Sequence, residues 1–176
     1  MSYYFVAGTD TGVGKTMVTS LLLQQGIAQG KTVLGLKPVA AGCQDTALGW
    51  RNEDAVILQA RSNVTVPYDR INAVALPAAT SPHIAAAKCP ITITAESVWH
   101  AYDWLSAESV DQVFFEGAGG WYCPLNDDES MADFVCHWRL RDRQSNIDHC
   151  SINGPKLRQC ISTQGIGRHQ KWRPRI

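Results

Sequence analysis

The sequence predicts an α/β fold, a three-layer sandwich whose central sheet is mainly parallel and whose C-terminal part is missing. Three observations lead to this prediction. First, an apolar run from Tyr3 to Val6 stops at Gly8, and a polar loop containing glycines then leads into a helical pattern. Second, another apolar run follows within about 40 residues, and strand, helix and strand at that spacing form a βαβ unit. Third, the composition changes abruptly at residue 138.

The loop after the first predicted strand, Gly8 to Thr16, has the layout of a P-loop. Its glycines let the backbone curl so that N–H groups converge on phosphate oxygens, and the positive end of the next helix dipole points to the same place. Lys15 adds a positive charge for the β- and γ-phosphates, and the Thr16 hydroxyl is a ligand for Mg²⁺. The other interpretation is a glycine-rich turn with a surface lysine. The strand–loop–helix context favours a nucleotide site and a P-loop NTPase-like fold.

The spacing of this loop is unusual, since Thr9 stands where the first glycine of the common motif belongs, and Gly8 lies one residue earlier. The motif Gly-Thr-Asp-Thr-x-Val-Gly-Lys-Thr at residues 8–16 closely resembles the P-loop of dethiobiotin synthetases. These enzymes catalyse the ATP-dependent ring-closing step of biotin synthesis. The resemblance implies that Thr11 contacts the substrate. It also implies an ATP-binding set that begins with Gly12, Val13, Gly14, Lys15, Thr16 and Met17.

Composition and charge suit one cytoplasmic globular domain. Apolar residues make up 45% of the 176 residues, which is normal for soluble proteins. No apolar run is long enough to span a bilayer, and no basic stretch precedes an apolar one at the N-terminus, so we expect no signal peptide. The six cysteines form no CxxC pair, which disfavours zinc and redox sites and predicts free thiols.

The next predicted elements are a helix over residues 15–29, which Gly30 ends, and a strand over residues 32–36. The core face of this helix is expected to consist of Val18, Leu21, Leu22, Ile27 and Ala28. The carboxyl end of the strand lies at the same edge of the sheet as the P-loop, where ligands of parallel sheets bind.

Lys37 follows this second strand. A lysine after a strand is usually only solvated. Lys-Pro-Val-Ala at 37–40, however, resembles the dethiobiotin synthetase motif whose lysine stabilises the reacting end of the substrate. That family usually has a hydroxyl residue where this chain has Ala41, so the resemblance leaves the Ala41 backbone for contact with the substrate.

Residues 44–51 are expected to form a polar loop, and residues 52–59 lead into a short helix. Acidic residues in a first helical turn are often only partners of the helix dipole, and we assign that role to Glu53. Arg-Asn-x-Asp-Ala at 51–55 resembles the family segment whose aspartate reaches the metal, which makes Asp54 the metal candidate.

Two further helices are expected, one with Ser81 as N-cap and Pro82 in its first turn, and one over residues 94–107. Thr-Ser-Pro-His at 80–83 is similar to a family segment that precedes a helix lining the substrate side. His83 is a tempting acid–base group, but a histidine in a capped helix is more often structural.

A third strand is predicted over residues 110–116, and it ends on a carboxylate, Glu116. An acid at the carboxyl end of a central strand facing a P-loop can hold Mg²⁺, although a glutamate often simply ends a strand. The glycines that follow favour the metal interpretation because they let backbone approach a ligand. Glu-Gly-Ala-Gly-Gly-Trp also matches the second signature of dethiobiotin synthetases. The resemblance adds Asp54, Glu116, Gly117, Ala118 and Gly119 to the ATP-binding set, and it assigns Thr16, Asp54 and Glu116 to the metal.

Residues 138–176 differ from the rest of the chain. Residues 1–137 hold 7 Lys and Arg against 14 Asp and Glu, whereas residues 138–176 hold 9 against 2. Residues 139–176 contain no Ala, Val, Phe, Met, Tyr or Glu and show no steady period. We expect this segment to be disordered, because it buries too little apolar surface to offset its ordering entropy. It is either a basic tail for nucleic acid or membrane or, as its composition favours, an out-of-frame translation.

The predicted organisation is therefore an incomplete P-loop domain over residues 1–137, with a helix starting near residue 129, and a tail over residues 138–176. The resemblance implies ATP- and Mg²⁺-dependent joining of CO₂ to 7,8-diaminononanoate, giving dethiobiotin, ADP and phosphate, with Lys37 and Lys15 as catalytic residues. It also implies a homodimer, with no nucleic-acid or membrane partner.

Two alternatives remain to this reading of the function. One is a partitioning-ATPase-like nucleotide switch, a class that carries an extra lysine early in the P-loop, where this chain has Thr9, Asp10 and Thr11. The other is an inactive, truncated remnant of the enzyme. In the intact family a strand beside the P-loop strand and part of the dimer interface should follow residue 137. We therefore expect this chain to be poorly soluble and to make little dethiobiotin.

Overall fold

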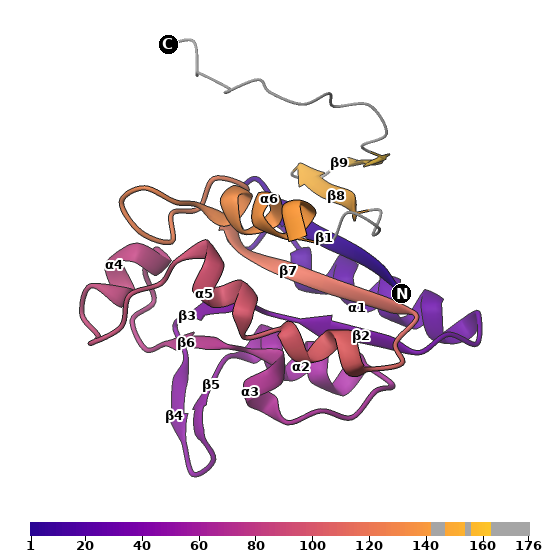
Figure 1. Cartoon of the computed structure of the whole chain (residues 1–176), viewed down its shortest axis with the longest axis horizontal. Coiled ribbons are helices and arrows are strands. Elements are labelled where there is room, and N and C mark those ends of the chain that lie inside the picture. Colours follow the sequence, from indigo (N-terminus) through magenta and orange to yellow (C-terminus); the bar gives the residue numbers. More distant parts are fainter. Residues whose placement is uncertain (142–146, 154–155, 163–176) are drawn as a thin grey trace.

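A five-stranded sheet with the order β2-β7-β1-β8-β9 forms the centre of the molecule. The structure is a computed structural model that describes residues 1–141, 147–153 and 156–162, with side chains described up to residue 137. The first four strands in that order run parallel and β9 runs antiparallel to β8 (Figure 1). The strands are β1 (Ser2–Gly8), β2 (Val33–Leu36), β7 (Gln112–Gly120), β8 (Ile147–Asn153) and β9 (Lys156–Ser162). The prediction of a mainly parallel sheet is confirmed.

Helices cover both faces of this sheet, which makes three layers (Figure 1). One face carries α1 (Lys15–Ala28) and α2 (Glu53–Arg61), and the other carries α5 (Ala95–His100) and α6 (Met131–Arg141). Neighbouring residues of β7 serve the two faces, because successive side chains of a strand point to opposite sides. Phe114 packs with Leu23 of α1, whereas Phe115 packs with Phe134 of α6 at 5.9 Å between ring centroids. The three-layer prediction is confirmed.

The buried face of α1 differs from the predicted one. Leu21 is 53% exposed and Ile27 is 40% exposed, so the expected apolar face is wrong in part. The buried residues are Lys15, Thr19, Leu23 and Gly26. A Cβ atom at Gly26 would lie 2.6 Å from Val33 Cγ1, so the helix runs too close to the sheet for a larger residue. The close approach of the helix, rather than the count of apolar residues, therefore selects this face.

Smaller elements flank the sheet beyond β2. Strand β3 (Val39–Ala41) pairs in parallel with β6 (Val74–Leu76), and α3 (Tyr68–Ile71) and α4 (Pro82–Ala86) lie nearby along the chain. The predicted polar loop at 44–51 is instead a hairpin of β4 (Gln44–Thr46) and β5 (Gly49–Arg51). Gly49 adopts φ +91°, and the Thr46 hydroxyl donates to its carbonyl at 2.7 Å. Gly49 therefore permits the tight turn that closes this hairpin.

The helix predicted over residues 94–107 is divided in two. α5 begins with a capping box in which the Thr94 hydroxyl accepts from Ser97 N at 2.9 Å. The chain then tightens into a 3₁₀ helix, η1 (Asp103–Ala107), through bonds from Tyr102 N to Trp99 O and from Leu105 N to Tyr102 O.

Strand β7 extends beyond its predicted end at Glu116 and runs through the glycines to Gly120. Gly120 pairs with Gly8 of β1, after a register irregularity between Val6 and Gly8. A Cβ atom at Gly120 would lie 2.8 Å from the carbonyl oxygen of Thr9. A glycine is therefore required where the end of β7 meets the P-loop.

The structure also differs from the absence of strands expected after residue 138. α6 continues to Arg141, and β8 pairs with β1 in parallel, from Tyr3 opposite Ile147 to Gly8 opposite Ile152. Backbone pairing satisfies the N–H and C=O groups of β1 without requiring an apolar sequence, so composition alone did not predict it. The domain boundary at residue 137 stays a prediction, and residues 142–146, 154–155 and 163–176 lie outside the described residues.

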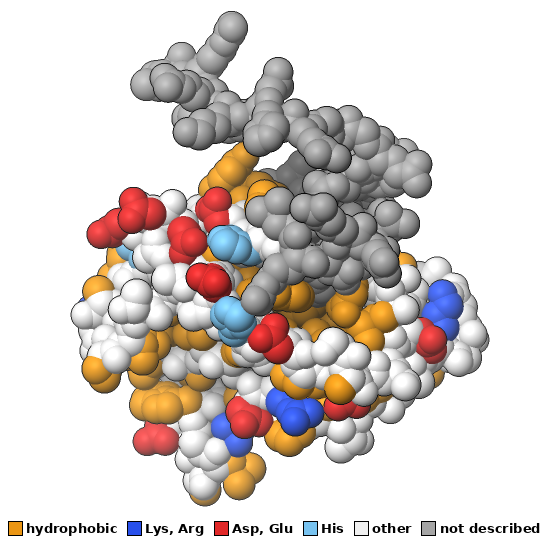
Figure 2. Space-filling model, viewed as in Figure 1, with side chains coloured by type: hydrophobic (Ala, Val, Ile, Leu, Met, Phe, Trp, Pro, Cys, Tyr) orange, Lys and Arg blue, Asp and Glu red, His pale blue; other side chains and the backbone are white. Residues whose placement is uncertain are grey.

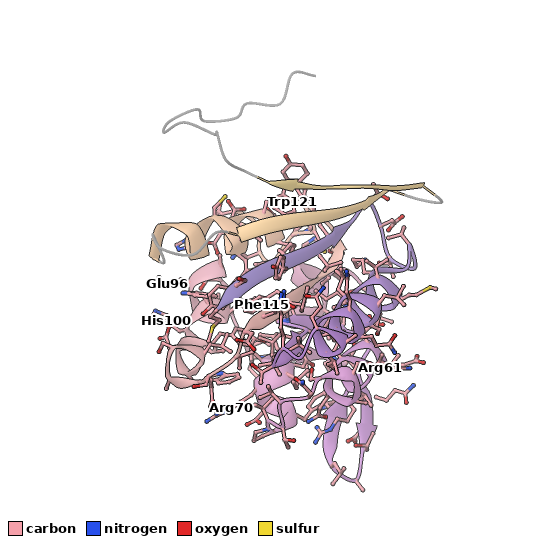
Figure 3. The ribbon with its side chains drawn as sticks, turned by 90° about the vertical axis from the view of Figure 1, so that its right-hand side faces the viewer. Arg61, Arg70, Glu96, His100, Phe115 and Trp121 are labelled. Atoms are coloured by element: carbon pink, nitrogen blue, oxygen red, sulfur yellow. The ribbon has the colours of Figure 1, made fainter. Side chains whose placement is uncertain are left out.

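Most charged side chains in the described part of the chain lie at the surface, whereas Lys15, Lys37 and Glu116 are buried. Asp and Glu side chains gather over the loop before α6 and around α5 and α6, with few Lys or Arg on that face (Figure 2). Phe115 lies inside the molecule, whereas Arg61 and Arg70 lie at its edge (Figure 3). In the described part of the chain, no helix combines the length and apolarity needed to cross a bilayer.

Candidate nucleotide and substrate pocket

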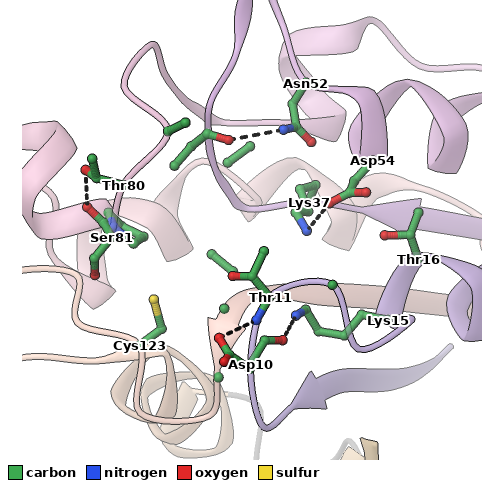
Figure 4. Close-up of a pocket in the computed structure, with 18 of the residues that line it drawn as sticks. Asp10, Thr11, Lys15, Thr16, Lys37, Asn52, Asp54, Thr80, Ser81 and Cys123 are labelled. Carbon is green, nitrogen blue, oxygen red and sulfur yellow. Dashed lines mark hydrogen bonds and ion pairs between the residues drawn. The ribbon is translucent and has the colours of Figure 1, made fainter. Parts of the chain in front are cut away.

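A pocket of about 710 Å³ lies where β1, β2 and β7 end (Figure 4). Parallel strands present their carboxyl ends at one edge of a sheet, so segments far apart in the sequence meet there. Ten of the predicted site residues line the pocket, namely Thr11, Gly12, Gly14, Lys15, Thr16, Lys37, Ala41, Asp54, Ala118 and Gly119.

The loop between β1 and α1 is shaped by glycines. Gly12 has φ +75° and Gly14 has φ +95°, a region that residues with a side chain rarely adopt. Gly14 is also the N-cap of α1, so the backbone N–H groups of the first helical turn face the loop. The N–H of Thr11 bonds the Asp10 carboxylate at 2.7 Å, which holds the front of the loop in place. The loop thus has the glycine conformations and the helix start of a P-loop, and its binding of phosphate stays a prediction.

The Lys15 side chain lies across the P-loop. It is 6% exposed, and its Nζ donates to the backbone carbonyl of Asp10 at 2.7 Å (Figure 4). Burial lowers the pKa of Lys15, and the nearby charge of Lys37 lowers it further. An anion in the pocket would offset both effects, because it would stabilise the charged ammonium.

Lys37 forms the centre of a buried charge cluster. Its Nζ lies 2.7 Å from Glu116 Oε1 and 2.9 Å from Asp54 Oδ2. The lysine is 4% exposed and Glu116 is fully buried. Burial disfavours the ammonium, but the carboxylates of Glu116 and Asp54 outweigh it and raise the pKa of Lys37 above its usual value. The raised pKa therefore favours the charged ammonium of Lys37 at the floor of the pocket.

Glu116 is held by two hydroxyl groups as well as by the lysine. Thr16 Oγ1 donates to Glu116 Oε1 at 2.8 Å, and Thr19 Oγ1 donates to Glu116 Oε2 at 3.0 Å. The hydroxyl of Thr19, one turn after Lys15, also lies 2.9 Å from the Lys15 carbonyl. The first turns of α1 thus fix the orientation of a carboxylate in the middle of β7.

Asp54 approaches the cluster from the start of α2. Asn52 is the N-cap of this helix, and its side-chain oxygen accepts from Ala55 N at 3.2 Å. Burial favours the protonated carboxyl of Asp54, but the Lys37 ammonium outweighs burial and lowers the pKa below its usual value. The Asp54 side chain is 41% exposed, so one side of it remains open to the pocket.

The remaining predicted residues do not line the pocket. Glu116 lies beneath it, bonded to Lys37, and the carbonyl of Gly117 lies 3.5 Å from Lys37 Nζ. Val13 packs beside Gly8, and the Met17 side chain is 70% exposed on α1. Their assignment to ATP stays a prediction.

Several pocket residues were not among the predicted site residues. The pocket is also lined by Asp10, Ala40, Asn52, Ala79, Thr80, Ser81, Pro82, Gly120 and Cys123. Ser81 lies at the N-cap of α4, but its hydroxyl bonds His83 Nδ1 at 2.9 Å and makes no cap bond. Burial raises the pKa of the Cys123 thiol. The Thr-Ser-Pro-His segment was a usable signal, whereas Cys123 had none in the sequence.

The donor set at the cluster suits a hard cation shared with a ligand. The described residues include no group of three or more His, Cys, Asp or Glu side chains placed to hold a metal ion. Thr16, Asp54 and Glu116 offer two carboxylates and one hydroxyl, and all three are joined by bonds to Lys37 or to one another. Mg²⁺ commonly binds one or two carboxylates together with nucleotide phosphates, so these residues fit it.

The chain is similar, over most of its length, to one family model and to several curated enzymes. A model described as an AAA domain matches residues 2–141. The ATP-dependent dethiobiotin synthetase BioD of Xylella fastidiosa (strain 9a5c) is 47% identical over 135 residues, which are 77% of this chain and 59% of that protein. The proteins of the same name from Marinobacter nauticus and Chromohalobacter salexigens are 46% and 50% identical over 129 and 141 residues. Those matches cover 73% and 80% of this chain but only 55% and 59% of those proteins, so the chain spans less than two thirds of their length.

Proposed function

The chain belongs to the AAA-domain family, and on that premise we propose that its pocket serves the reaction named for its relatives, the ATP-dependent synthesis of dethiobiotin. One observation carries the proposal. Two buried lysines, Lys15 on the P-loop and Lys37 after β2, converge on one pocket with the carboxylates of Asp54 and Glu116. Such an arrangement of charges would favour a reaction between a nucleoside triphosphate and a second anionic group.

The nucleotide side of the pocket is the loop from Gly12 to Thr16. The backbone N–H groups and the Lys15 ammonium bind the phosphates, with Gly117, Ala118 and Gly119 of β7 completing the ATP-binding set. Val13 and Met17 belong to this set only through the resemblance. The Asp10 carbonyl that now accepts from Lys15 would yield that place to a phosphate oxygen, a stronger acceptor.

Mg²⁺ belongs to the proposal through Thr16, Asp54 and Glu116. When bound there with nucleotide, the ion would neutralise phosphate charge. The residues of the chain contribute independently of it, because Thr16 and Thr19 already hold the Glu116 carboxylate in one orientation.

The substrate side comprises Thr11, Lys37 and Ala41. In the proposed reaction one amine of 7,8-diaminononanoate adds to CO₂ and loses a proton, forming a carbamate. The γ-phosphoryl group of ATP transfers to the carbamate, leaving ADP. The second amine then attacks the carbamate carbon and expels phosphate, which closes the ureido ring. Lys37 stabilises the anionic carbamate, and Ala41 offers only its backbone.

Homodimer assembly and a cytoplasmic location are part of the same proposal. Their support is the resemblance to the family, in which the substrate site lies between subunits. The dimer is implied for the intact family, and part of its interface is expected after residue 137. Analytical ultracentrifugation of a version with the family's C-terminal half restored therefore tests the assembly, and a monomer at every concentration reached would contradict it.

Titration of ATP with Mg²⁺ into the chain by calorimetry tests the nucleotide side. Lys15→Ala removes one charged donor and should weaken binding by about 1.5–3 kcal/mol. The matched control is Lys88→Ala, because Lys88 is an exposed lysine that does not line the pocket, and it should leave the affinity unchanged. Equal affinities of wild type and Lys15→Ala would remove the phosphate role.

Ring closure, measured as dethiobiotin formed from the diamine, bicarbonate and ATP, tests the reaction. The Lys37 test needs a version of the enzyme with the family's C-terminal half restored. In that version Lys37→Gln should lower turnover roughly 100-fold, because a charge that stabilises the reacting group is lost, while ATP affinity changes little. Collapse of ATP binding with surviving turnover would make the Lys37 assignment wrong. The same assay on the chain as it is tests the expected low turnover. ATP binding without ring closure would favour an inactive remnant of the enzyme or a partitioning-ATPase-like nucleotide switch.

A further inference from the structure

Asn72, which does not line the pocket, is tied to the main chain of Lys37. It is 4% exposed, and its side-chain Nδ2 donates to the Lys37 carbonyl at 2.8 Å and to the Val74 carbonyl at 3.0 Å. The Lys37 N–H donates in turn to the carbonyl of Ile71 at 2.8 Å. Both polar groups of the Lys37 backbone are therefore fixed by the segment around α3.

Tyr68 connects the same asparagine to α2. Its hydroxyl donates to Asn72 Oδ1 at 3.3 Å and accepts from the backbone N–H of Asn52 at 2.7 Å. Burial raises the pKa of Tyr68, so the phenol keeps the proton that it donates. The Arg51 guanidinium lies 4.1 Å above the centre of the ring and holds it in place.

Asn52 passes this constraint on to Asp54. As the N-cap of α2, it stands two residues before the aspartate and bonds Ala55 N through its own side chain. Its Nδ2 also donates to the Ala41 carbonyl at 3.4 Å (Figure 4). The start of α2 is thus held from both sides, by Tyr68 and by β3.

We propose that Asn72 and Tyr68 are positioning residues that hold the Lys37 main chain and the start of α2 in register, so that the Lys37 ammonium and the Asp54 carboxylate meet. Neither side chain touches the pocket, and both act through the residues they bond. The geometric part of this inference stands on the contacts alone, and its consequence for turnover rests on the proposed function. Asn72 is buried, and both ends of its side-chain amide are bonded, which favours a fixed orientation and suits this role.

Tyr68→Phe tests the inference because it removes only the hydroxyl and keeps the ring under Arg51. The measurement is the rate at which each lysine of the intact chain reacts with trace acetic anhydride, resolved by peptide mass spectrometry. The rate of Lys37, divided by the rate of exposed Lys88, should be about fivefold higher in Tyr68→Phe than in wild type. This is the factor expected for one typical hydrogen bond. Lys15, which is also buried but held by the P-loop, should change less than about twofold.

Controls separate positioning from general loosening. Tyr4→Phe removes a hydroxyl that accepts from Gln112 on the sheet, and it should leave all three rates unchanged. In an Asp54→Asn background the pair is already broken, so Tyr68→Phe should add less than about twofold to the Lys37 rate. An unchanged Lys37 rate, equal rises at Lys15 and Lys37, or a full effect in the Asp54→Asn background would each overturn the proposal.

These outcomes do not depend on turnover. If the wild-type chain closes no ring and the lysine rates behave as expected, the positioning stands and the proposed function fails. Where ring closure is measurable, Tyr68→Phe should lower kcat several-fold and leave the KM for ATP unchanged, because the P-loop is untouched. A rise in that KM with kcat unchanged would contradict positioning of the Lys37–Asp54 pair.

Discussion

Replacing Lys37 by methionine would leave the buried carboxylate of Glu116 without its cation. Glu116 is fully buried, and Thr16 and Thr19 would be its remaining side-chain donors. Removing one partner of a buried ion pair typically costs about 3–5 kcal/mol, because the other charge stays desolvated. The Lys37–Asp54 contact adds less, since the Asp54 side chain is 41% exposed and water can replace the lysine there. We expect Lys37→Met to lower the free energy of unfolding by about 3–5 kcal/mol at pH 7.

The double variant Lys37→Met/Glu116→Gln distinguishes this explanation from a general packing defect. A neutral glutamine can still accept from the threonine hydroxyls and carries no unpaired charge. Its loss of stability should be smaller than the sum of the two single losses by about 1–3 kcal/mol, the usual range for residues in contact. Lys88→Met, at an exposed lysine, should stay within about 0.5 kcal/mol of wild type.

Urea unfolding followed by tryptophan fluorescence supplies these free energies, because Trp99 packs 6.0 Å from Phe134 and 6.3 Å from Phe115 in the core. Equal slopes of free energy against urea across the variants would show that the same transition is compared. The reasoning is refuted if Lys37→Met costs less than about 1 kcal/mol, or if the double variant loses the full sum.

Three further perturbations test other contacts. Gly120→Ala would place a Cβ atom 2.8 Å from the Thr9 carbonyl oxygen, so the P-loop must shift. The ATP affinity, measured by calorimetry, should therefore fall roughly tenfold, and an unchanged affinity would contradict the contact. The pKa of Asp54 is lowered in the fold, so its contribution is present above about pH 5 and is lost as the pH falls below about 4. The stability difference between wild type and Asp54→Asn, below about 1 kcal/mol after solvent screening, should therefore shrink as the pH falls below about 4, and a difference that grows there would be the wrong sign. Phe134→Ala should cost about 3–5 kcal/mol of unfolding free energy, because this fully buried ring packs against three other aromatic rings.

The convergence of Lys15, Lys37 and Glu116 could be predicted from the sequence because topology determines it. Lys15 and Lys37 follow parallel strands, whose carboxyl ends meet at one edge, and Glu116 comes directly after Phe115, the partner of the last residue of β2. Asp54 is different, since it lies on a helix, and only the resemblance to a family pointed to it. Its place beside Lys37 depends on Asn52, a cap whose role is visible once the helix start is known.

Other features could not be predicted because they depend on distances between elements. The buried face of α1 follows from the close approach of Gly26 to Val33, which apolar periodicity does not encode. Nothing in the sequence distinguishes Thr19 from an ordinary helix residue, because its bond to Glu116 joins positions 97 residues apart. The pairing of β8 with β1 is a backbone interaction, so the side-chain composition of the tail gave no signal of it.

The ion pair at the floor of the pocket means that the carboxylates of Asp54 and Glu116 already have a counter-ion. A divalent ion bound to those oxygens would compete with the Lys37 ammonium, so an ion arriving alone would be at a disadvantage. An ion that arrives with phosphates brings further ligands and can complete the exchange. Lys37, once displaced, would be a positive charge free to meet the anions of the pocket, so the binding of a metal ion and the release of this lysine would be coupled.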